Sequence, residues 1–403
     1  MFIKINLINN ITKNTFTNGF FYLDISFDKS YTIIMSVKIN KNFNIKINDN
    51  EYTLDSGIPY NFIVHTTDKI NLLISRLHNE IIINEDIEYI YVHEYGRPYK
   101  ISNYKYQLVY SFDEKYFVGA FASIYSLIFN TGKINLNDIN INIIIPKNDI
   151  YVFLKKYSKL IEKMNYSPNI SVYLVDNDIV PKNIISTTCF KGGNHLLKLS
   201  NFCRLLIGHL INCDSILYID SDTIIQKDIT HIFNKLNSDY VIMGNKSNLT
   251  YNNILNSNNK NKILTKINDK SLFEKNIIYT GTLIINPVKL RENFNNMIEI
   301  VNLHNSLIEM GGLYKLFTMS IINLGLYGKI SFYNNILTNV VDLGNNLNLS
   351  HEIIQNADIL DWSGIYKPWF TNGMYQEYWK KYNLLFEIKD IVTINKNTVE
   401  SFE

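Results

Sequence analysis

The chain has 403 residues, of which 46% are hydrophobic and 19% charged, and its formal net charge is +2. This much apolar material excludes a disordered chain, and a nearly neutral charge without a Lys/Arg cluster predicts neither a nucleic-acid partner nor an anionic membrane surface as a partner. The length exceeds what one hydrophobic core usually holds, so we expect two domains.

Cysteine usage and hydropathy indicate where the protein acts. The three cysteines are odd in number and have no paired spacing, which argues against a disulfide framework. The N-terminal stretch MFIKINLINNITKN is broken by polar residues, unlike a signal peptide, and no run of roughly 18 apolar residues predicts a transmembrane segment. We therefore expect a reducing, cytoplasmic location.

Residues 1–103 consist of short β-type runs separated by Asn, Asp, Lys and Gly. The runs are FFYLDISF, YTIIMSVKI, FNIKI, YNFIVHTT and INLLISRL. Their spacing predicts a smaller all-β, sandwich-like module. It contains no catalytic cluster, so a structural or interaction role is favoured over sugar binding.

Residues 104–385 alternate apolar strands with longer helical patterns, which is typical of an open α/β sheet. The expected strands are 106–112, 141–146, 171–175, 215–219, 240–244, 281–286 and 329–333. The expected helices are 118–130, 150–164, 196–211 and 288–309. Residues 386–403 are expected to form a C-terminal tail.

Two carboxylates end the expected strand 215–219, in the stretch LYIDSDTIIQKDI. Ligands of open α/β sheets collect at the carboxyl ends of strands. Asp220 and Asp222 flank Ser221, so one can bind a divalent cation while the other binds it too or orients the substrate. Such a cation would neutralise a diphosphate leaving group. Because VYLVDND ends another strand in Asp-x-Asp, the pattern alone does not decide its function.

Three further features accompany the Asp-x-Asp pair. Arg204 stands sixteen positions before Asp220, in RLLIGHLINCDSILYIDSD. SFDEKY, residues 111–116, ends the first strand of the α/β region. DWSGIYKPW, residues 361–369, combines a carboxylate, a glycine, a lysine and two tryptophans. Each feature is chemically suited to part of a nucleotide sugar, although Trp362 and Trp369 are best explained as packing residues.

Together these motifs resemble glycosyltransferase family 8 over residues 104–385. The resemblance implies a glycosyltransferase-A fold, which is Rossmann-like with a mixed, mostly parallel sheet. It also implies a UDP-sugar donor, a Mn²⁺ or Mg²⁺ ion, and transfer of a hexose with retention of configuration. The acceptor, whether glycan, protein or lipid, is not indicated, and a homodimer is left open.

The resemblance also assigns residues, position by position. The implied metal ligands are Asp220, Asp222 and Asp361. The implied donor-binding residues are Asp113, Tyr116, Arg204, Ser221, Gly364 and Lys367, with Asp113 and Tyr116 on the uracil base. Arg204 and Lys367 are the implied catalytic residues, because their charges neutralise the diphosphate.

The chain departs from the family pattern at several positions. Asp361 replaces a metal-binding histidine, which leaves an oxygen-only ligand set suited to Mn²⁺ or Mg²⁺. Tyr279 stands where asparagine is expected, and Thr318, Met319 and Ser320 replace polar residues that line the donor sugar. These changes predict a different donor sugar, slow transfer, or a fold kept without catalysis.

Two alternatives therefore accompany the transferase hypothesis. One is a non-catalytic protein that binds a nucleotide sugar or a glycan on the same scaffold. The other is a phosphoryl- or nucleotidyl-transferase that uses the same pair of carboxylates, which would release pyrophosphate rather than a nucleoside diphosphate.

Overall fold

The computed structural model divides the chain into two compact units, Met1–Tyr99 and Lys100–Glu403. Before residue 104 it describes strands β1–β10. From residue 104 to residue 385 it describes all residues except 133–135, 167, 176–198, 234–238, 334–337, 347 and 365. The second Asp-x-Asp, Asp176 and Asp178, and the predicted tail 386–403 lie outside the described residues.

The described elements of the first unit are strands. They are β1 (Phe2–Ile5), β2 (Ile11–Thr17), β3 (Phe20–Ser26), β4 (Tyr31–Ile39), β5 (Phe43–Ile47), β6 (Asn50–Leu54), β7 (Pro59–Thr66), β8 (Lys69–Arg76) and β9 (Ile87–Glu94), with β10 (Tyr99–Lys100) at the boundary. One sheet has the order β1-β9-β4-β7 and another the order β2-β3-β8-β5-β6. The predicted β-type runs are thus paired as strands, while a sandwich-like module ending at residue 103 stays a prediction.

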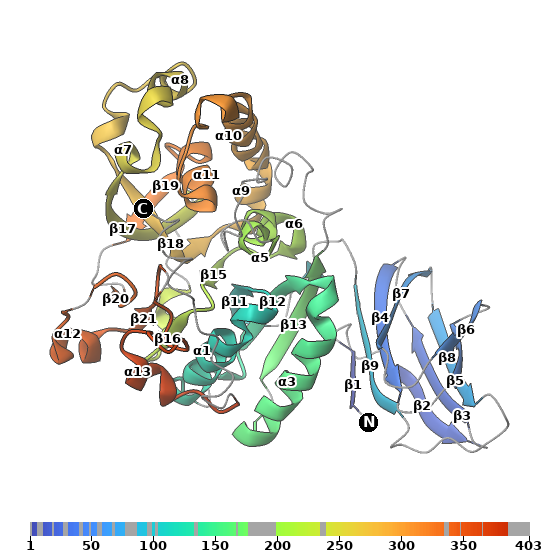
Figure 1. Cartoon of the computed structure of the whole chain (residues 1–403). Helices are drawn as coiled ribbons and strands as arrows, with labels where there is room; N and C mark the ends of the chain where they lie inside the picture. The colour runs from blue at the N-terminus through green and yellow to red at the C-terminus, as the bar shows by residue number, and fades with distance from the viewer. Residues whose placement is uncertain are drawn as a thin grey trace. The chain divides into compact units, whose positions relative to one another are not determined.

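The second unit is built on a seven-stranded sheet with the order β13-β12-β11-β15-β18-β17-β19 (Figure 1). Its strands are β11 (Tyr106–Ser111), β12 (Ile139–Pro146), β13 (Asn169–Val175), β15 (Ile216–Ile219), β17 (Ile242–Thr250), β18 (Asn276–Ile285) and β19 (Ile330–Tyr333). β18 runs antiparallel to β15 and β17, and the other neighbours are parallel. This mixed, mostly parallel sheet confirms the predicted α/β class and each predicted strand.

The central strands are buried on both faces, so they appear in the sequence as apolar runs rather than as alternating patterns. Asn140 and Asn142 in β12 are exceptions. Their side-chain amides donate to Gln107 Oε1 at 3.3 and 3.2 Å, which satisfies these buried polar groups. β11, β12 and β15 consequently provide a rigid base for the loops at their carboxyl ends.

Two predicted helices are confirmed and two are interrupted. α1 (Phe117–Asn130) and α3 (Ile150–Met164) lie alongside β11–β13 (Figure 1). The predicted helix 288–309 divides into α9 (Pro287–Glu292) and α10 (Phe294–Ser306), followed by a 3-10 turn at Ile308–Met310. The break falls at Asn293, whose side chain and backbone N–H both donate to Lys289 O, at 2.8 and 3.1 Å.

The predicted helix 196–211 is likewise divided. Its described part comprises α5 (Leu199–Phe202), a 3-10 turn at Cys203–Leu206 and α6 (Ile207–Leu210), followed by β14 (Ile211–Asn212). Arg204 Nε donates to Asn201 O at 3.2 Å, an oxygen that in an α-helix accepts the backbone N–H four residues on. The tightened turn carries Arg204 toward the end of β15.

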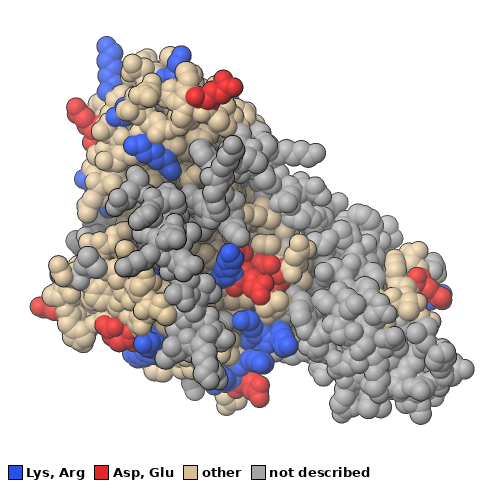
Figure 2. Space-filling model, in the orientation of Figure 1, with Lys and Arg blue, Asp and Glu red and all other residues tan. Residues whose placement is uncertain are grey.

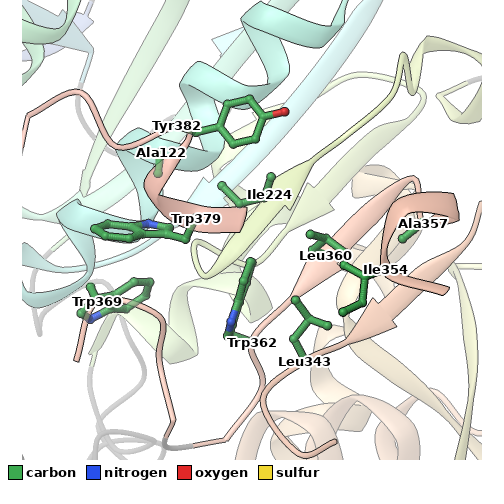
Figure 3. Packing of buried hydrophobic residues seen from close by; sticks show 10 residues of the cluster. All are labelled: Ala122, Ile224, Leu343, Ile354, Ala357, Leu360, Trp362, Trp369, Trp379 and Tyr382. Carbon is green, nitrogen blue, oxygen red and sulfur yellow. The ribbon is translucent and has the colours of Figure 1, made fainter. Parts of the chain in front are cut away.

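A second, three-stranded sheet was not predicted, because its strands are too short to show periodicity. It contains β16 (Thr223–Ile225), β21 (Ile359–Asp361) and β20 (Val340–Asp342) in that spatial order. A core cluster packs beside it (Figure 3), made of Ala122, Ile224, Leu343, Ile354, Ala357, Leu360, Trp362, Trp369, Trp379 and Tyr382. Trp362 and Trp369 are therefore packing residues, as predicted.

The remaining described α-helices complete the second unit. They are α7 (Tyr251–Ile254), α8 (Lys260–Leu264), α11 (Phe317–Gly325), α12 (His351–Asn356) and α13 (Gln376–Lys380). Basic and acidic side chains of the described surface are interspersed on the face shown in Figure 2. Within the described part of the chain, no helix has both the length and the apolar character needed to cross a bilayer.

A buried histidine in α10 should make stability depend on pH. His304 Nδ1 accepts backbone N–H groups of Leu313 and Tyr314 at 3.1 and 3.3 Å, and burial lowers the pKa of His304 to about 4. Below about pH 6.5, the ordinary pKa of a histidine, His304 of the unfolded chain is protonated, whereas His304 of the folded chain stays neutral. Unfolding free energy is therefore expected to fall between pH 6.5 and pH 4, with His304 contributing up to ~3 kcal/mol.

The variant His304→Gln tests this, because its side-chain carbonyl can accept the same N–H groups without titrating. Urea unfolding at several pH values should show a smaller loss of stability on acidification in the variant than in the wild type. Parallel pH profiles for the two proteins would contradict the assignment.

Candidate active site

The Asp-x-Asp loop, residues 220–222, connects the end of β15 to the start of β16. Its backbone is fixed at both ends, since Asp220 N donates to Gly281 O at 2.8 Å and Trp362 N donates to Asp222 O at 3.0 Å. Ser221 between them is only 5% exposed. The loop thus begins at the carboxyl end of a buried central strand, as the sequence predicts.

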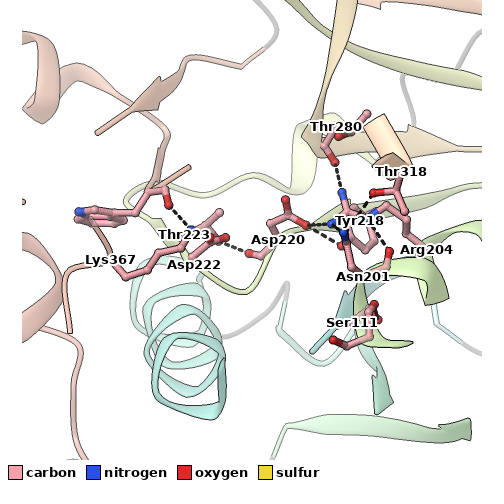
Figure 4. A network of polar contacts seen from close by, with 12 residues as sticks. Ser111, Asn201, Arg204, Tyr218, Asp220, Asp222, Thr223, Thr280, Thr318 and Lys367 are labelled. Atoms are coloured by element: carbon pink, nitrogen blue, oxygen red, sulfur yellow. Dashed lines mark hydrogen bonds and ion pairs between the residues drawn. The ribbon is translucent and has the colours of Figure 1, made fainter. Parts of the chain in front are cut away.

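Asp220 is held by an arginine and a tyrosine (Figure 4). Its Oδ1 lies 3.0 Å from Arg204 Nη2 and accepts a hydrogen bond from Tyr218 Oη at 2.6 Å. Tyr218 is two residues earlier in β15, so its side chain leaves the strand on the same face. Burial raises the pKa of Asp220, and the positive charge of Arg204 opposes that shift. These contacts fix the orientation of the carboxylate.

The guanidinium of Arg204 is occupied by the chain itself. Besides the ion pair, Nε donates to Asn201 O at 3.2 Å, Nη2 to Asn201 Oδ1 at 2.8 Å and Nη1 to Thr280 O at 3.2 Å. These contacts use most of the five N–H donors of a guanidinium. In this structure Arg204 positions Asp220, and its contact with a diphosphate stays a prediction.

Asp222 forms an ion pair with Lys367. Lys367 Nζ donates to Asp222 Oδ2 and to Trp362 O, the latter at 2.5 Å, and the lysine is 5% exposed. Nζ also lies 5.9 Å from the centroid of the Tyr116 ring. Burial lowers the pKa of Lys367, but the charge of Asp222 and the proximity of Tyr116 outweigh it, and the pKa lies above its ordinary value. The site therefore contains a buried ammonium that remains charged.

Asp361 comes from a distant part of the sequence to the same place. It ends β21 and lies opposite Thr223 of β16 in the strand register, one residue after Asp222. It is fully buried, and among the described residues neither carboxylate oxygen has a hydrogen-bond partner. Burial, followed by the charges of Asp222 and Asp220, raises the pKa of Asp361 well above its ordinary value. An unpaired buried carboxylate costs free energy, and such groups concentrate at functional sites.

The predicted base-binding residues lie beside this centre. Asp113 accepts hydrogen bonds from Lys115 N at 3.0 Å and Ser200 Oγ at 3.2 Å, so its carboxylate caps the 3-10 turn Glu114–Tyr116. Tyr116 contacts Trp369 edge to face, with ring centroids 5.8 Å apart, and burial raises the pKa of Tyr116 to about 12. Asp113 thus orients the turn that carries Tyr116, and a contact with uracil stays a prediction.

Gly364 occupies a turn that a side chain would strain. Its φ is +78°, and a Cβ there would lie 2.9 Å from Asn345 Oδ1. The glycine is exposed and lies three residues before Lys367. It therefore allows the chain to turn between Asp361 and Lys367, while its predicted donor contact is untested.

In the segment 318–320, which departs from the family pattern, two side chains form hydrogen bonds within the fold. Thr318 Oγ1 donates to Asn201 Oδ1 at 3.2 Å, and Ser320 Oγ accepts Leu316 N at 3.2 Å. Both residues are buried. Thr318 supports the asparagine that holds Arg204, and Ser320 stabilises the start of α11.

The structure brings Asp220, Asp222, Asp361, Arg204 and Lys367 together, while their roles as metal and donor ligands stay predictions. It adds supporting residues that sequence reasoning missed: Asn201, Tyr218 and Thr280. Two of them carry a local signal, because Asn201 precedes Arg204 by one helical turn and Tyr218 lies two residues before Asp220 in a strand. Thr280 acts through its backbone, which leaves no mark in the sequence.

A divalent cation is compatible with this arrangement. In the described part of the chain, no three His, Cys, Asp or Glu side chains are placed as a finished metal site. Arg204 and Lys367 neutralise two of the three carboxylates, and the two oxygens of Asp361 lack a partner. A cation would supply that partner, and an oxygen-only set suits Mn²⁺ or Mg²⁺. These carboxylates therefore have the chemistry that the implied ion needs, and their assignment as its ligands stays a prediction.

A mixed, mostly parallel sheet with helices is consistent with the glycosyltransferase-A fold. Among solved structures, the chain is similar to the WbbM bifunctional glycosyltransferase in its apo form, with TM-score 0.53, 17% identity and coverage of 76% of this chain and 54% of WbbM. The chain thus spans about half the length of WbbM. The likeness shows the fold alone.

Other similar structures are glycosyltransferases too. An active-site mutant of LgtC has TM-score 0.49, 14% identity and coverage of 72% of this chain and 98% of LgtC. GlyE of Streptococcus pneumoniae TIGR4 has TM-score 0.44, 15% identity and coverage of 71% of this chain and 62% of GlyE. No curated protein matches the sequence. Residues 107–373 match the model of glycosyl transferase family 8, which is more than half of the chain, so the chain belongs to this family.

Proposed function

We propose that the second unit transfers a hexose from a UDP-sugar to an acceptor, with a divalent cation and with retention of configuration. Membership of glycosyltransferase family 8 supports glycosyl transfer. The observation that carries the finer proposal is the buried, unpaired carboxylate of Asp361 beside the Asp220–Asp222 loop. The acceptor would be a glycan, a protein or a lipid.

Asp220, Asp222 and Asp361 would hold Mn²⁺ or Mg²⁺. When bound, the ion would act as a Lewis acid on the diphosphate. The chain's own part is to fix these carboxylates, since Arg204 and Tyr218 hold Asp220, and the β16–β21 register holds Asp361 next to Asp222.

Lys367 would neutralise the leaving group. In transfer, the bond between the sugar C1 and the diphosphate oxygen breaks, its electron pair leaves with UDP, and C1 bonds to an acceptor oxygen that loses its proton. A buried ammonium stabilises the charge that develops on the departing oxygen. Tyr116, supported by Asp113 and Trp369, would provide the surface for the base.

A non-catalytic nucleotide-sugar or glycan-binding protein remains the second candidate. It is favoured by Thr318 and Ser320, which are buried and bonded within the fold rather than presented to a ligand. Purified protein incubated with Mn²⁺ and a panel of UDP-sugars separates the two. Release of UDP supports the transferase, and binding without UDP release, repeated with candidate acceptors, supports the binding protein.

The Asp222→Asn variant tests the proposed ligand set. We expect the gain in UDP affinity that Mn²⁺ produces in the wild type to be lost, because one carboxylate ligand is replaced by a neutral amide. Titration calorimetry of UDP with and without Mn²⁺ measures this gain. Asp214→Asn, an exposed residue outside the site, is the matched control. An unchanged gain in Asp222→Asn would refute the assignment.

A further inference from the structure

Three consecutive residues of β18, Tyr279 to Gly281, lie against the carboxylates. Gly281 O accepts Asp220 N at 2.8 Å, and Thr280 O accepts Arg204 Nη1 at 3.2 Å. Both contacts come from the backbone and fix the Asp220 side of the site. The side chain of Tyr279 is the part of this segment that the proposed function does not use.

Tyr279 and Asp361 share the space left by the missing side chain of Gly281. A Cβ on Gly281 would lie 2.6 Å from Tyr279 Cε1 and Oη, and 2.7 Å from Asp361 Oδ2. Real Cβ atoms do not make contacts this short, so the tyrosine ring fits here because residue 281 is glycine. Tyr279 and Gly281 are two residues apart in a strand and thus lie on the same face. The phenol oxygen is thereby placed beside the Asp361 carboxylate.

The chemistry of the two groups is complementary. Asp361 is fully buried, and a phenol is a hydrogen-bond donor. The Tyr279 hydroxyl lies beside Asp361 Oδ2, although the two groups do not meet the geometry of a hydrogen bond in this structure. A phenol holds its proton below its ordinary pKa of about 10, so this hydroxyl can act as a donor.

We propose that Tyr279 is a positioning residue whose hydroxyl orients the Asp361 carboxylate toward a bound divalent cation. The inference rests on the proposed function, because it needs the cation at Asp220, Asp222 and Asp361. With the cation bound, this hydroxyl would donate a hydrogen bond to the Asp361 carboxylate, and loss of such a donor to a metal ligand typically weakens metal binding by about 10- to 100-fold. Tyr279 and Asp361, two of the departures from the family pattern, would then act together.

The test compares Mn²⁺ affinity, measured by titration calorimetry and by electron paramagnetic resonance of free Mn²⁺, in the full chain. We expect Tyr279→Phe to bind Mn²⁺ about 10- to 100-fold more weakly than the wild type. Tyr333→Phe is the matched control. Tyr333 is buried in β19, and its hydroxyl donates to the backbone oxygen of Thr282 in β18, the strand of Tyr279, at 3.1 Å. We expect its affinity to equal that of the wild type, and melting temperatures of both variants report their folding.

Each outcome decides between specific statements. Equal Mn²⁺ affinity in Tyr279→Phe and the wild type overturns the role of Tyr279, and so does an equal loss in Tyr333→Phe. If the wild type binds Mn²⁺ and Asp361→Asn does not, while Tyr279→Phe is unaffected, the proposed ligand set stands and only this inference falls. Absence of Mn²⁺ binding by the wild type removes both.

Discussion

The Lys367→Met variant is expected to release UDP from the donor about 100- to 1,000-fold more slowly than the wild type, as is typical when one group that stabilises developing charge is removed. Lys367 is a buried ammonium in the described site, and its Nζ already contacts Asp222 and Trp362 O. Methionine keeps the length of the side chain and removes the charge. Initial rates of UDP release at saturating donor and Mn²⁺ measure the effect.

A matched control separates lost charge at the site from lost charge in general. Lys227 forms an ion pair with Asp358 at 3.0 Å, and its side chain is 49% exposed. Lys227→Met should keep the wild-type rate, because an exposed pair contributes little.

Lys367→Met also leaves Asp222 buried and unpaired, which destabilises the fold. The double variant Asp222→Asn/Lys367→Met should regain stability without regaining activity. A wild-type rate in Lys367→Met would exclude the lysine from transfer.

The fold could be predicted from the sequence where burial alone determines the pattern. β11, β12 and β15 are covered on both faces, so continuous apolar runs located them. The predicted helix 196–211 fails where the Arg204 side chain competes for the backbone oxygen of Asn201. The predicted helix 288–309 breaks at Asn293, whose side chain and backbone N–H share Lys289 O. Periodicity contains no information on such competition.

The residues of the candidate site could be predicted from the sequence, but the contacts among them could not. Strand-end position selected Asp220 and Asp222, and resemblance to the family selected Asp361 and Lys367. The pairing among these groups was not predictable. Arg204 and Lys367 each carry one positive charge and could have faced a ligand, yet both neutralise a carboxylate in this structure. The Lys367–Asp222 pair depends on the register of β16 with β21, and three-residue strands leave no sequence pattern from which to read that register.

The Asp361→Asn variant is expected to gain stability and lose cation binding. Asp361 is buried without a hydrogen-bond partner among the described residues, near the charges of Asp222 and Asp220. Replacing this acid with a neutral side chain of the same shape removes that repulsion and should stabilise the fold by about 1–3 kcal/mol. Thermal unfolding in the presence of a chelator measures the gain.

The same variant should not respond to Mn²⁺. A ligand that binds only the folded protein stabilises it, by about 2.7 kcal/mol at one hundred times its dissociation constant, so the wild type should melt at a higher temperature as Mn²⁺ is added. Asp361→Asn should melt at the same temperature with and without Mn²⁺. The control is Asp214→Asn, which should behave like the wild type in both conditions because residue 214 is exposed.

Two results would contradict this assignment. Asp361→Asn could be less stable than the wild type without metal, or Mn²⁺ could still raise the melting temperature of Asp361→Asn. In either case Asp361 is not an unpaired carboxylate that serves to bind a cation. The proposal that the Asp361 carboxylate lowers the stability of the fold but binds the cation would then have to be abandoned.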